Sequence, residues 1–368
     1  MKIRFWQNIV SPHQSEVLNA LASQKGAFVS LIVQDDFSAE RKRLGWKEPV
    51  LHNVQIVRDW SASDVNALLN DRHDIEIFTA PWGYRKIRAA FRAAVERPEI
   101  RIAVMSEPGD WRGIKGFARV LRGRIHAALY QKRVAFVLAI GDLAEEWFRK
   151  CRFPTNKIFP YAYTTAKLST EISMPEGPHR KLAFVGQLVH RKGVDRLLFA
   201  LAELRSMDWE MAVVGDGAGR PYFQLLSRIL GIGDRVRFLG VLAQTKVIEQ
   251  IGKSDLLILP SRWDGWGAVV NEALQCGVPV LCSDTCGAKR LIRNGRDGQV
   301  FRHDGRPSLI ERLRELLTMP AYDAEARESI AERAGAVSGS AVAKYLEQII
   351  RWSSGASHER PVAPWDAE

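Results

Sequence analysis

Two carboxylates and a glycine-rich turn are the residues of this 368-residue chain whose types and spacing could do chemistry. Asp264 and Glu272 are separated by seven residues, and a Gly-Trp-Gly turn (265–267) follows the first acid directly. The run 268–275 is helical in pattern and ends at a glycine, with a proline two residues later. A helix N-terminus presents unpaired backbone N–H groups and a partial positive charge. The pattern therefore predicts a diphosphate site, with one acid facing a sugar hydroxyl and the other a ribose.

Alternating strand and helix patterns must position these residues. Short runs rich in β-branched residues predict strands at 28–34, 54–58, 75–81, 100–107 and 136–141, and again at 182–188, 210–216, 236–242, 255–261, 279–284 and 298–301. Helical patterns lie between them, at 13–25, 84–97, 114–133, 193–205 and 221–230. This alternation predicts an α/β protein with two doubly wound, Rossmann-like domains. Ligands of such sheets bind at the carboxyl ends of the strands.

The domain boundaries follow from composition. Residues 169–179 contain two prolines and few apolar residues, and we interpret them as a linker. They divide an N-terminal domain (1–168) from a C-terminal domain (180–340). A helix is expected at 341–352, and the polar tail 353–368 is expected to be disordered.

The segment around the two acids resembles a known family. An acid, seven residues and then Glu-Ala-x-x-x-Gly-x-Pro-Val is the signature of retaining glycosyltransferases of the GT-B fold, family four, and here it runs from Asp264 to Val280. The family usually has Glu where this chain has Asp264. The resemblance covers residues 182–301, whereas the first half is similar only in layout. It implies two domains facing a cleft, of which 1–168 binds the acceptor and 180–340 binds the nucleotide sugar, and a last helix that crosses back to the first domain. It also implies a nucleotide-diphosphate sugar as donor, with no metal and no other cofactor.

The resemblance also assigns the donor side. Family members use an Arg and a Lys after the first strand of this domain to hold the diphosphate. Lys192 matches, but Gln187 stands at the Arg position, and a neutral amide lacks the forked charge of a guanidinium. We therefore expect Arg191 and Lys192 to form the cationic pair. The implied donor-binding residues are Gly186, Gln187, Arg191, Lys192, Gly215, Gly240, Val241, Asp264, Gly265, Trp266, Gly267 and Glu272.

The glycines of residues 214–219 could alternatively be interpreted as a dinucleotide-binding fingerprint. Their spacing is G-x-G-x-G rather than G-x-G-x-x-G, and no acid ends a strand about 20 residues later. Nicotinamide binding is therefore not expected. The four cysteines form no metal-binding pattern and are interpreted as reduced thiols.

Two residues of the first half are candidates for the acceptor side. His13 begins a helix and could contact acceptor or phosphate, or could simply be a surface or capping residue. Glu107 ends a strand, at a place where relatives often carry a His, and could accept the proton of the acceptor hydroxyl. The alternative for Glu107 is a loop carboxylate that pairs with a nearby Arg. With these, the predicted catalytic residues are Asp264, Glu107, Arg191 and Lys192.

The positive charge is concentrated in the first half. The chain carries +11, and residues 1–178 hold 27 Lys and Arg against 19 Asp and Glu. Two helical segments, 84–97 and 114–133, carry much of this excess, which suggests an anionic partner such as a membrane surface. The apolar stripe of the second segment is expected to face the core. We therefore expect these helices either to adsorb to a membrane surface without inserting into it or to present a solvated basic face. Residues 1–6 form a strand pattern with no secretory signal, so a cytoplasmic location is expected.

Together these patterns predict a retaining transferase that moves a sugar from a nucleotide-diphosphate sugar to a glycan acceptor. A lipid-linked acceptor at the cytoplasmic membrane face, in polysaccharide assembly, is the hypothesis that the basic first half suggests. Two alternatives remain open. One is a nucleotide-sugar epimerase of the same layout. The other, ranked last because no reading motif is present, is a non-catalytic or nucleic-acid-binding protein.

Overall fold

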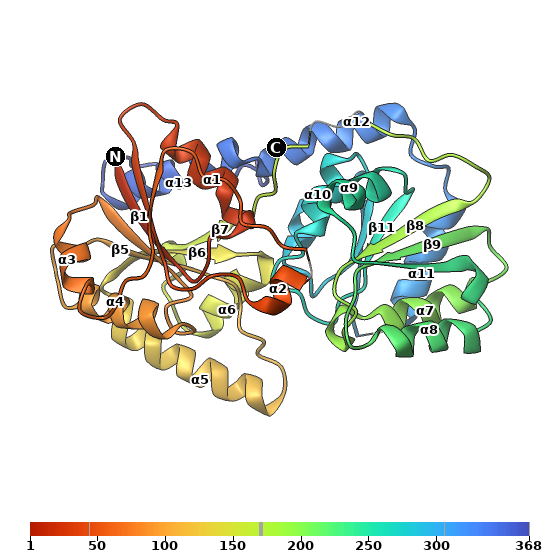
Figure 1. The fold of residues 1–368 in the computed structure, drawn as a ribbon, viewed down its shortest axis with the longest axis horizontal. Coiled ribbons are helices and arrows are strands. Elements are labelled where there is room, and N and C mark those ends of the chain that lie inside the picture. The colour runs from red at the N-terminus through yellow and green to blue at the C-terminus, as the bar shows by residue number, and fades with distance from the viewer. Residues whose placement is uncertain (44, 169–171, 305, 368) are drawn as a thin grey trace. The chain divides into compact units, whose positions relative to one another are not determined.

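The computed structural model describes residues 1–43, 45–168, 172–304 and 306–367. The chain forms two compact units, each built on its own sheet (Figure 1). Unit 1 comprises Met1–Ser38, Lys47–Ala166 and Ala336–Glu368, and unit 2 comprises Ala39–Trp46 and Lys167–Gly335. Residues 169–171 of the predicted linker lie outside the described residues.

Unit 1 contains a seven-stranded parallel sheet with the order β3-β2-β1-β4-β5-β6-β7. With the exception of the edge strand β3, its strands are largely buried, which is why they are rich in apolar residues. They are β1 (Lys2–Gln7), β2 (Phe28–Val33), β3 (Val54–Val57), β4 (Ile75–Thr79), β5 (Ile102–Ser106), β6 (Val134–Ile140) and β7 (Ile158–Tyr161). The helices are α1 (Pro12–Ala22), α3 (Val65–Asn70), α4 (Arg85–Val95), α5 (Gly113–Tyr130), α6 (Asp142–Lys150) and α13 (Gly339–Ser353). Figure 1 shows α1 and α13 on one face of the sheet and α4, α5 and α6 on the other.

Unit 2 contains a six-stranded parallel sheet with the order β10-β9-β8-β11-β12-β13. Its strands are β8 (Arg180–Val185), β9 (Trp209–Val214), β10 (Val236–Gly240), β11 (Leu256–Leu259), β12 (Val280–Ser283) and β13 (Gly298–Phe301). Its helices are α2 (Ala39–Arg43), α7 (Val194–Glu203), α8 (Arg220–Ile229), α9 (Gln244–Gly252), α10 (Val269–Gln275), α11 (Arg306–Thr318) and α12 (Ala324–Arg333). The helices α9, α10 and α12 cover one face, and α7, α8 and α11 cover the other (Figure 1).

Both sheets are doubly wound, as the alternation of strands and helices predicts. In each sheet the strand order reverses once, between β1 and β4 in unit 1 and between β8 and β11 in unit 2. The loops that leave two such strands diverge to opposite faces and leave space at the carboxyl edge. The reversal points are therefore the places where a ligand site is expected in each unit.

The last long helix belongs to the first unit, as predicted. α13 packs against α1, with Val342, Leu346 and Ile349 fully buried. Gly339 lets the two helices approach, since a Cβ there would lie 2.6 Å from the carbonyl oxygen of Glu16. Unit 1 is therefore assembled from the beginning and the end of the chain.

The prediction of a disordered tail after residue 353 is wrong for its second half. Ala363 and Trp365 are buried, and the Trp365 ring packs edge-on against Tyr345 with 5.8 Å between centroids. The guanidinium of Arg360 lies 4.2 Å from the Phe159 ring centroid and donates to the carbonyl of Ile158. The tail is polar in composition, but two apolar residues and one stacked arginine are sufficient to attach it to unit 1.

The prediction that the apolar stripe of residues 114–129 faces the core is also wrong. The buried residues of α5 are Gly116 and Ala127. A Cβ on Gly116 would lie 2.0 Å from the backbone of Trp111, and one on Gly123 would lie 2.3 Å from the Sγ of Cys151. The helix packs on its small residues because they permit close approach, and its large apolar residues point outward.

Candidate functional site

The reversal point of unit 2 brings the predicted cations and the first acid together. Arg191 and Lys192 end a short 3-10 turn, η2 (His190–Lys192), that follows β8, and Asp264 lies in the loop after β11. Lys192 Nζ donates to Asp264 Oδ2 at 2.5 Å, and Arg191 Nη1 lies 3.8 Å from Asp264 Oδ1. Residues 72 positions apart in the sequence thus form one charged cluster at the carboxyl edge of the sheet.

The two cations have different surroundings. The Lys192 side chain is only 13% exposed, and Asp264 beside it is buried. The Arg191 side chain is 45% exposed and donates to the carbonyl of Trp263 at 2.8 Å. Lys192 is therefore a fixed, desolvated charge, whereas Arg191 keeps part of its guanidinium in solvent.

Arg262 holds η2 in place, and sequence analysis missed it. Its guanidinium makes two 2.7 Å hydrogen bonds to Asp195, and it donates to the carbonyl of His190 at 2.9 Å. Its backbone N–H also donates to the carbonyl of Arg191 at 2.8 Å. Burial alone would raise the pKa of Asp195, but the bonds from Arg262 hold it below its ordinary value. This paired fork fixes the turn that carries both cations.

A glycine permits the close approach of the two loops. Gly193 follows Lys192 and has φ +73°. A Cβ at this position would lie 2.1 Å from the carbonyl oxygen of Pro260, which begins the loop to Asp264. A side chain would force the two loops apart and separate Lys192 from Asp264.

The predicted glycines of β8, β9 and β10 lie side by side. Gly186 N donates to the Val214 carbonyl at 3.0 Å, and Gly215 N donates to the Gly240 carbonyl at 2.7 Å. A Cβ on Gly215 would lie 2.0 Å from the Gly186 oxygen. Gln187 continues from Gly186 and is partly buried. The strand ends beside the cationic pair are therefore bare backbone, which suits the approach of a flat or phosphorylated ligand.

The turn 265–267 is anchored from inside. Trp266 is buried, and its indole N–H donates to Asn271 Oδ1 at 2.9 Å. Ala288 N donates to the Trp266 carbonyl at 2.8 Å, and Gly287 N donates to the Asp264 carbonyl at 3.0 Å. Because the indole of Trp266 is occupied in the interior, a part in ligand binding would fall to its backbone. Gly265 and Gly267 flank it in the same turn.

Glu272 has partners distinct from those of Asp264. It lies in α10, and the side-chain amide of Gln244, the first residue of α9, donates to it at 2.8 Å. Burial raises the pKa of Glu272 to about 7, although the bond from Gln244 acts in the opposite direction. Gln244 follows Gly240 and Val241 closely, so Glu272 lies beside the β10–α9 loop. The two acids therefore serve two neighbouring places rather than one carboxylate pair.

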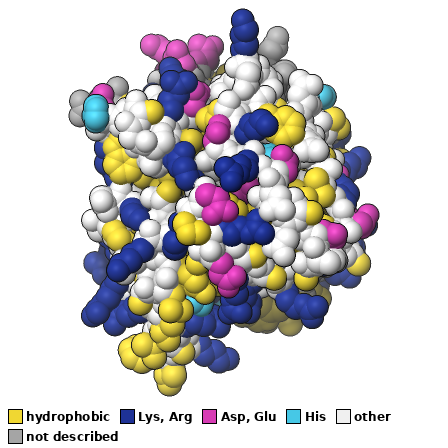
Figure 2. All heavy atoms as spheres, turned by 90° about the vertical axis from the view of Figure 1, so that its left-hand side faces the viewer, with side chains coloured by type: hydrophobic (Ala, Val, Ile, Leu, Met, Phe, Trp, Pro, Cys, Tyr) yellow, Lys and Arg dark blue, Asp and Glu magenta, His cyan; other side chains and the backbone are white. Residues whose placement is uncertain are grey.

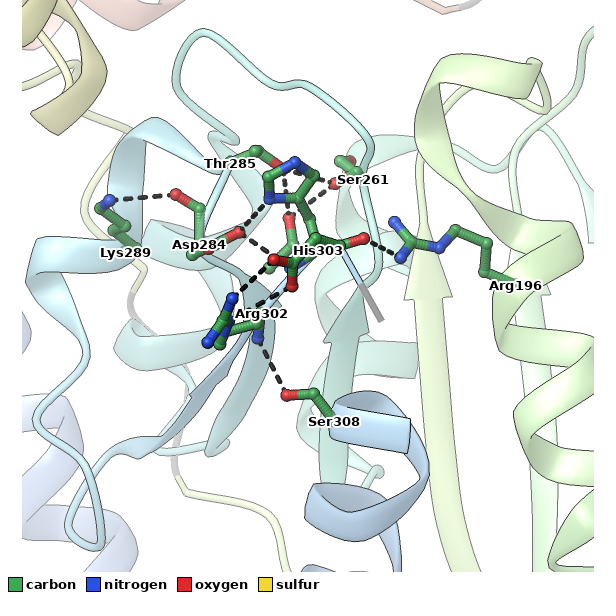
Figure 3. Close-up of polar contacts among 10 residues, drawn as sticks. Arg196, Ser261, Asp284, Thr285, Lys289, Arg302, His303 and Ser308 are labelled. Atoms are coloured by element: carbon green, nitrogen blue, oxygen red, sulfur yellow. Dashed lines mark hydrogen bonds and ion pairs between the residues drawn. The ribbon is translucent and has the colours of Figure 1, made fainter. Parts of the chain in front are cut away.

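A polar network supports the loop that carries Asp264 (Figure 3). The hydroxyl groups of Ser283 and Thr285 donate to the Ser261 carbonyl at 2.6 and 2.9 Å. Asp284 Oδ1 accepts hydrogen bonds from the backbone and the Nδ1 of His303, at 3.0 and 2.8 Å. The network joins the ends of β11, β12 and β13. Its signal in the sequence is the polar Ser-Asp-Thr run that directly follows a buried strand.

The acceptor-side candidates lie in unit 1, at the carboxyl edge of its sheet. Ser11 caps α1 by accepting from His13 N at 3.3 Å, and the His13 ring lies 5.4 Å from that of Tyr163. Glu107 is exposed and follows β5. Gln14 Nε2 lies 3.3 Å from Met105 Sδ, which brings the start of α1 beside the end of β5. Both candidates remain predictions.

Within the described ranges, no group of three or more His, Cys, Asp or Glu residues could hold a metal ion. None of the helices in that part of the chain combines the length and the apolar character needed to cross a bilayer. The four cysteines are buried thiols.

Known proteins resemble part of this chain in sequence. The family model described as glycosyl transferases group 1 matches residues 170–336. The alpha-D-kanosaminyltransferase of Streptomyces kanamyceticus is 29% identical over 55% of this chain and 55% of its own length. A GDP-mannose-dependent phosphatidylinositol monomannoside mannosyltransferase of Mycolicibacterium smegmatis is 29% identical over 46% of each chain. The chain therefore spans about half the length of the curated relatives it matches.

Solved structures resemble the chain over nearly its full length. The lipopolysaccharide outer core galactosyltransferase WaaB has a TM-score of 0.72 at 18% identity, with 95% of this chain and 99% of that one covered. HepE of Anabaena, solved in complex with UDP and glucose, has a TM-score of 0.68 at 15% identity, with 94% and 98% covered. The epimerase alternative receives no support from these relatives, whose names are those of transferases. The chain has the GT-B fold, and its residues 170–336 match the family model of glycosyl transferases group 1.

Proposed function

We propose that the protein transfers a sugar from a nucleotide-diphosphate sugar to a glycan acceptor with retention of the anomeric configuration. The observation that carries the proposal is the cluster of Lys192, Arg191 and Asp264 at the reversal point of unit 2. Fixed cations beside bare glycine backbone suit a diphosphate, and a structural neighbour is solved with UDP and glucose. The family match of the same unit gives independent support.

In the proposed reaction the protein supplies position and charge. Lys192 and Arg191 offset the negative charge that builds on the departing diphosphate. Asp264 orients the donor sugar, and Glu272 accepts hydrogen bonds from the ribose hydroxyls. The acceptor attacks from the face that the diphosphate leaves, and the leaving phosphate takes the acceptor proton, with Glu107 as the alternative proton acceptor.

A panel of nucleotides tests the donor half of this proposal. Thermal unfolding is measured with UDP, GDP and their sugars, for the wild type, Glu272→Ala and the exposed control Lys246→Ala. We expect one nucleotide to raise the melting temperature of the wild type and of Lys246→Ala but not of Glu272→Ala. No stabilisation of the wild type by any nucleotide would contradict the donor site.

The acceptor that we propose is a lipid-linked glycan at the inner face of the cytoplasmic membrane. The positive excess of the first half supports it, as do the names of two similar proteins, which act on a phosphatidylinositol mannoside and on lipopolysaccharide. Sugar transfer from the donor selected above is measured to lipid extracts and to water-soluble oligosaccharides. Transfer to the soluble acceptors alone would contradict a lipid-linked acceptor.

We further propose that the reaction needs no metal ion, because two side-chain cations already face the proposed diphosphate position. Turnover is measured after treatment with EDTA and after re-addition of Mg²⁺ or Mn²⁺. Unchanged rates are expected, and a loss with EDTA that either ion restores would contradict this point.

A further inference from the structure

The helix α5 carries a continuous apolar stripe that no other part of unit 1 covers in the described structure. Ile114, Phe117, Leu121, Ile125 and Leu129 are 91, 70, 52, 52 and 62% exposed. Their spacing of three or four residues places them in one row along the helix. Figure 2 shows hydrophobic side chains projecting at the bottom of this face, beside Lys and Arg side chains. A row of this length on one helix is an interaction surface rather than scattered surface residues.

The outward orientation is built into the packing of α5. The inner face consists of Gly116, Gly123 and Ala127, which approach the backbone of Trp111 and the side chain of Cys151 too closely for larger residues. On the neighbouring side, the rings of His126 and Tyr130 pack against Trp82 and Phe91. Rotating the helix to bury the stripe would expose these aromatic contacts and place Ile and Leu where only glycine fits.

Cations flank the stripe on both sides. The helix contains Lys115, Arg119, Arg122 and Arg124, and no acidic residue from Gly113 to Tyr130. Arg119 and Arg124 donate to the main-chain carbonyls of Asp110 and Lys150. The exposed Arg88 and Arg92 of α4 lie close enough to act on His126 of α5. An apolar row flanked by cations is complementary to a surface that has an anionic outer layer and an apolar interior.

We propose that α5 binds in the plane of an anionic lipid bilayer, with the apolar stripe at the boundary of headgroups and acyl chains and the flanking cations at the phosphates. A second copy is a poorer partner for this face, because a twofold pairing of α5 with itself would bring its cations close to those of the other copy. The inference goes beyond the proposed sugar transfer and is tested without it.

Vesicle binding separates the apolar and the charged contributions. Partition of the whole protein is measured by co-sedimentation with vesicles of phosphatidylcholine alone and with 30% phosphatidylglycerol. We expect tight binding to the anionic vesicles alone. The variant Ile114→Ser/Phe117→Ser/Leu121→Ser should bind at least tenfold more weakly. The variant Lys115→Gln/Arg122→Gln should bind about tenfold to thirtyfold more weakly, since each cation near an anionic surface contributes about a fivefold factor.

A matched control is available on unit 2. Tyr222, Leu225 and Ile229 form a similar exposed apolar row on α8, at 54, 55 and 71%. Their triple replacement by Ser removes comparable apolar area and should leave vesicle binding unchanged. All three variants should keep the melting temperature of the wild type within about 2 °C, because the replaced side chains are exposed.

Insertion is measured directly with an environment-sensitive dye on Phe117→Cys, since the four native thiols are buried and eleven tryptophans obscure intrinsic fluorescence. A blue shift on anionic vesicles is expected. The proposal is overturned if the wild type does not bind anionic vesicles, if the α5 apolar variant binds as the wild type does, or if the dye stays in water. Binding of an acidic protein in place of vesicles would likewise reassign the surface. Nucleotide stabilisation reports on the donor site separately, so the two proposals can fail independently.

Discussion

Lys192 and Arg191 adjoin in the sequence, but the structure gives them unequal surroundings. Lys192 is nearly buried against Asp264, whereas Arg191 is half exposed and bonded to a main-chain carbonyl. A charge in a desolvated place interacts more strongly with a diphosphate than one in contact with water. The two residues are therefore not interchangeable.

We predict that Lys192→Ala lowers kcat/KM for donor turnover about 10²- to 10³-fold, the usual effect of removing one preorganised charge-stabilising group. Arg191→Ala should cost about tenfold. The control is Lys246→Ala, whose side chain is 67% exposed on α9. Steady-state sugar transfer measures all three, and an Arg191→Ala loss larger than that of Lys192→Ala would reverse the assignment.

Glu272 predicts a pH dependence of nucleotide binding. Its pKa is about 7 in the unliganded protein, so at pH 6 the side chain is mostly protonated. Hydrogen bonds from the ribose hydroxyls favour the ionised form of Glu272. Nucleotide affinity should therefore rise about tenfold from pH 6 to pH 8, and binding near pH 7 should release a proton. Calorimetry in buffers of different ionisation enthalpy measures both. Glu272→Gln should lose the dependence, and an unchanged pH profile in that variant would rule out Glu272 as its source.

The raised pKa of Glu272 makes the stability of the fold change with pH in the direction opposite to nucleotide affinity. In the unfolded chain the carboxyl ionises near its ordinary value of 4.5, well below its pKa in the folded state. The folded state therefore holds the proton more tightly, and this contribution to the free energy of unfolding falls as the pH rises from about 4.5 to about 7.

At the scale of elements, Gly193 joins η2 to α7 and keeps two loops in contact. We predict that Gly193→Ala destabilises the protein by about 3 kcal/mol and weakens nucleotide binding, because φ is positive and the Pro260 oxygen occupies the place of the Cβ. Gly335→Ala is the control, since nothing lies within 4 Å of the added methyl group. Urea unfolding compares the two variants, and equal effects would show that the close approach is unimportant.

Much of the element order could be predicted from the sequence. Strands buried on both faces are continuous apolar runs, and the eleven runs named from the sequence agree with β2 to β6 and β8 to β13 within about three residues at each end. β7 (Ile158–Tyr161) escaped because a proline interrupts a short edge strand. The outward orientation of the apolar stripe of α5 was not predicted, because periodicity identifies a stripe but not whether it faces the core or the surface.

The candidate site was predictable where a motif carries it. Lys192 and Asp264 were identified in advance, and the structure places them in contact. Arg262 was not, because its bond to Asp195 joins residues 67 positions apart and neither belongs to a motif. Trp266 was expected at the donor, but its side chain is buried. Long-range support of this kind follows from the fold rather than from local pattern.

At the scale of the whole molecule, the end of the chain completes the first unit. We predict that Trp365→Ala lowers the free energy of unfolding by about 2 to 3 kcal/mol, because the ring is buried against Tyr345. The exposed Val362, in the same tail, supplies the control Val362→Ala, which should be nearly neutral. Chemical denaturation measures both, and a neutral Trp365→Ala would show that the tail does not contribute.

The return of α13 to α1 also orders events during synthesis. The ribosome emits residues 1–166 first, but the apolar face of α1 stays uncovered until residues 342–350 emerge. By then all of unit 2, which ends at Gly335, has already been synthesised, including all its strands and its helices α7 to α12. The second unit can therefore finish folding before the first. A nascent chain stalled just after residue 335 has left the ribosome should expose α1 to chaperones and proteases while it already binds nucleotide.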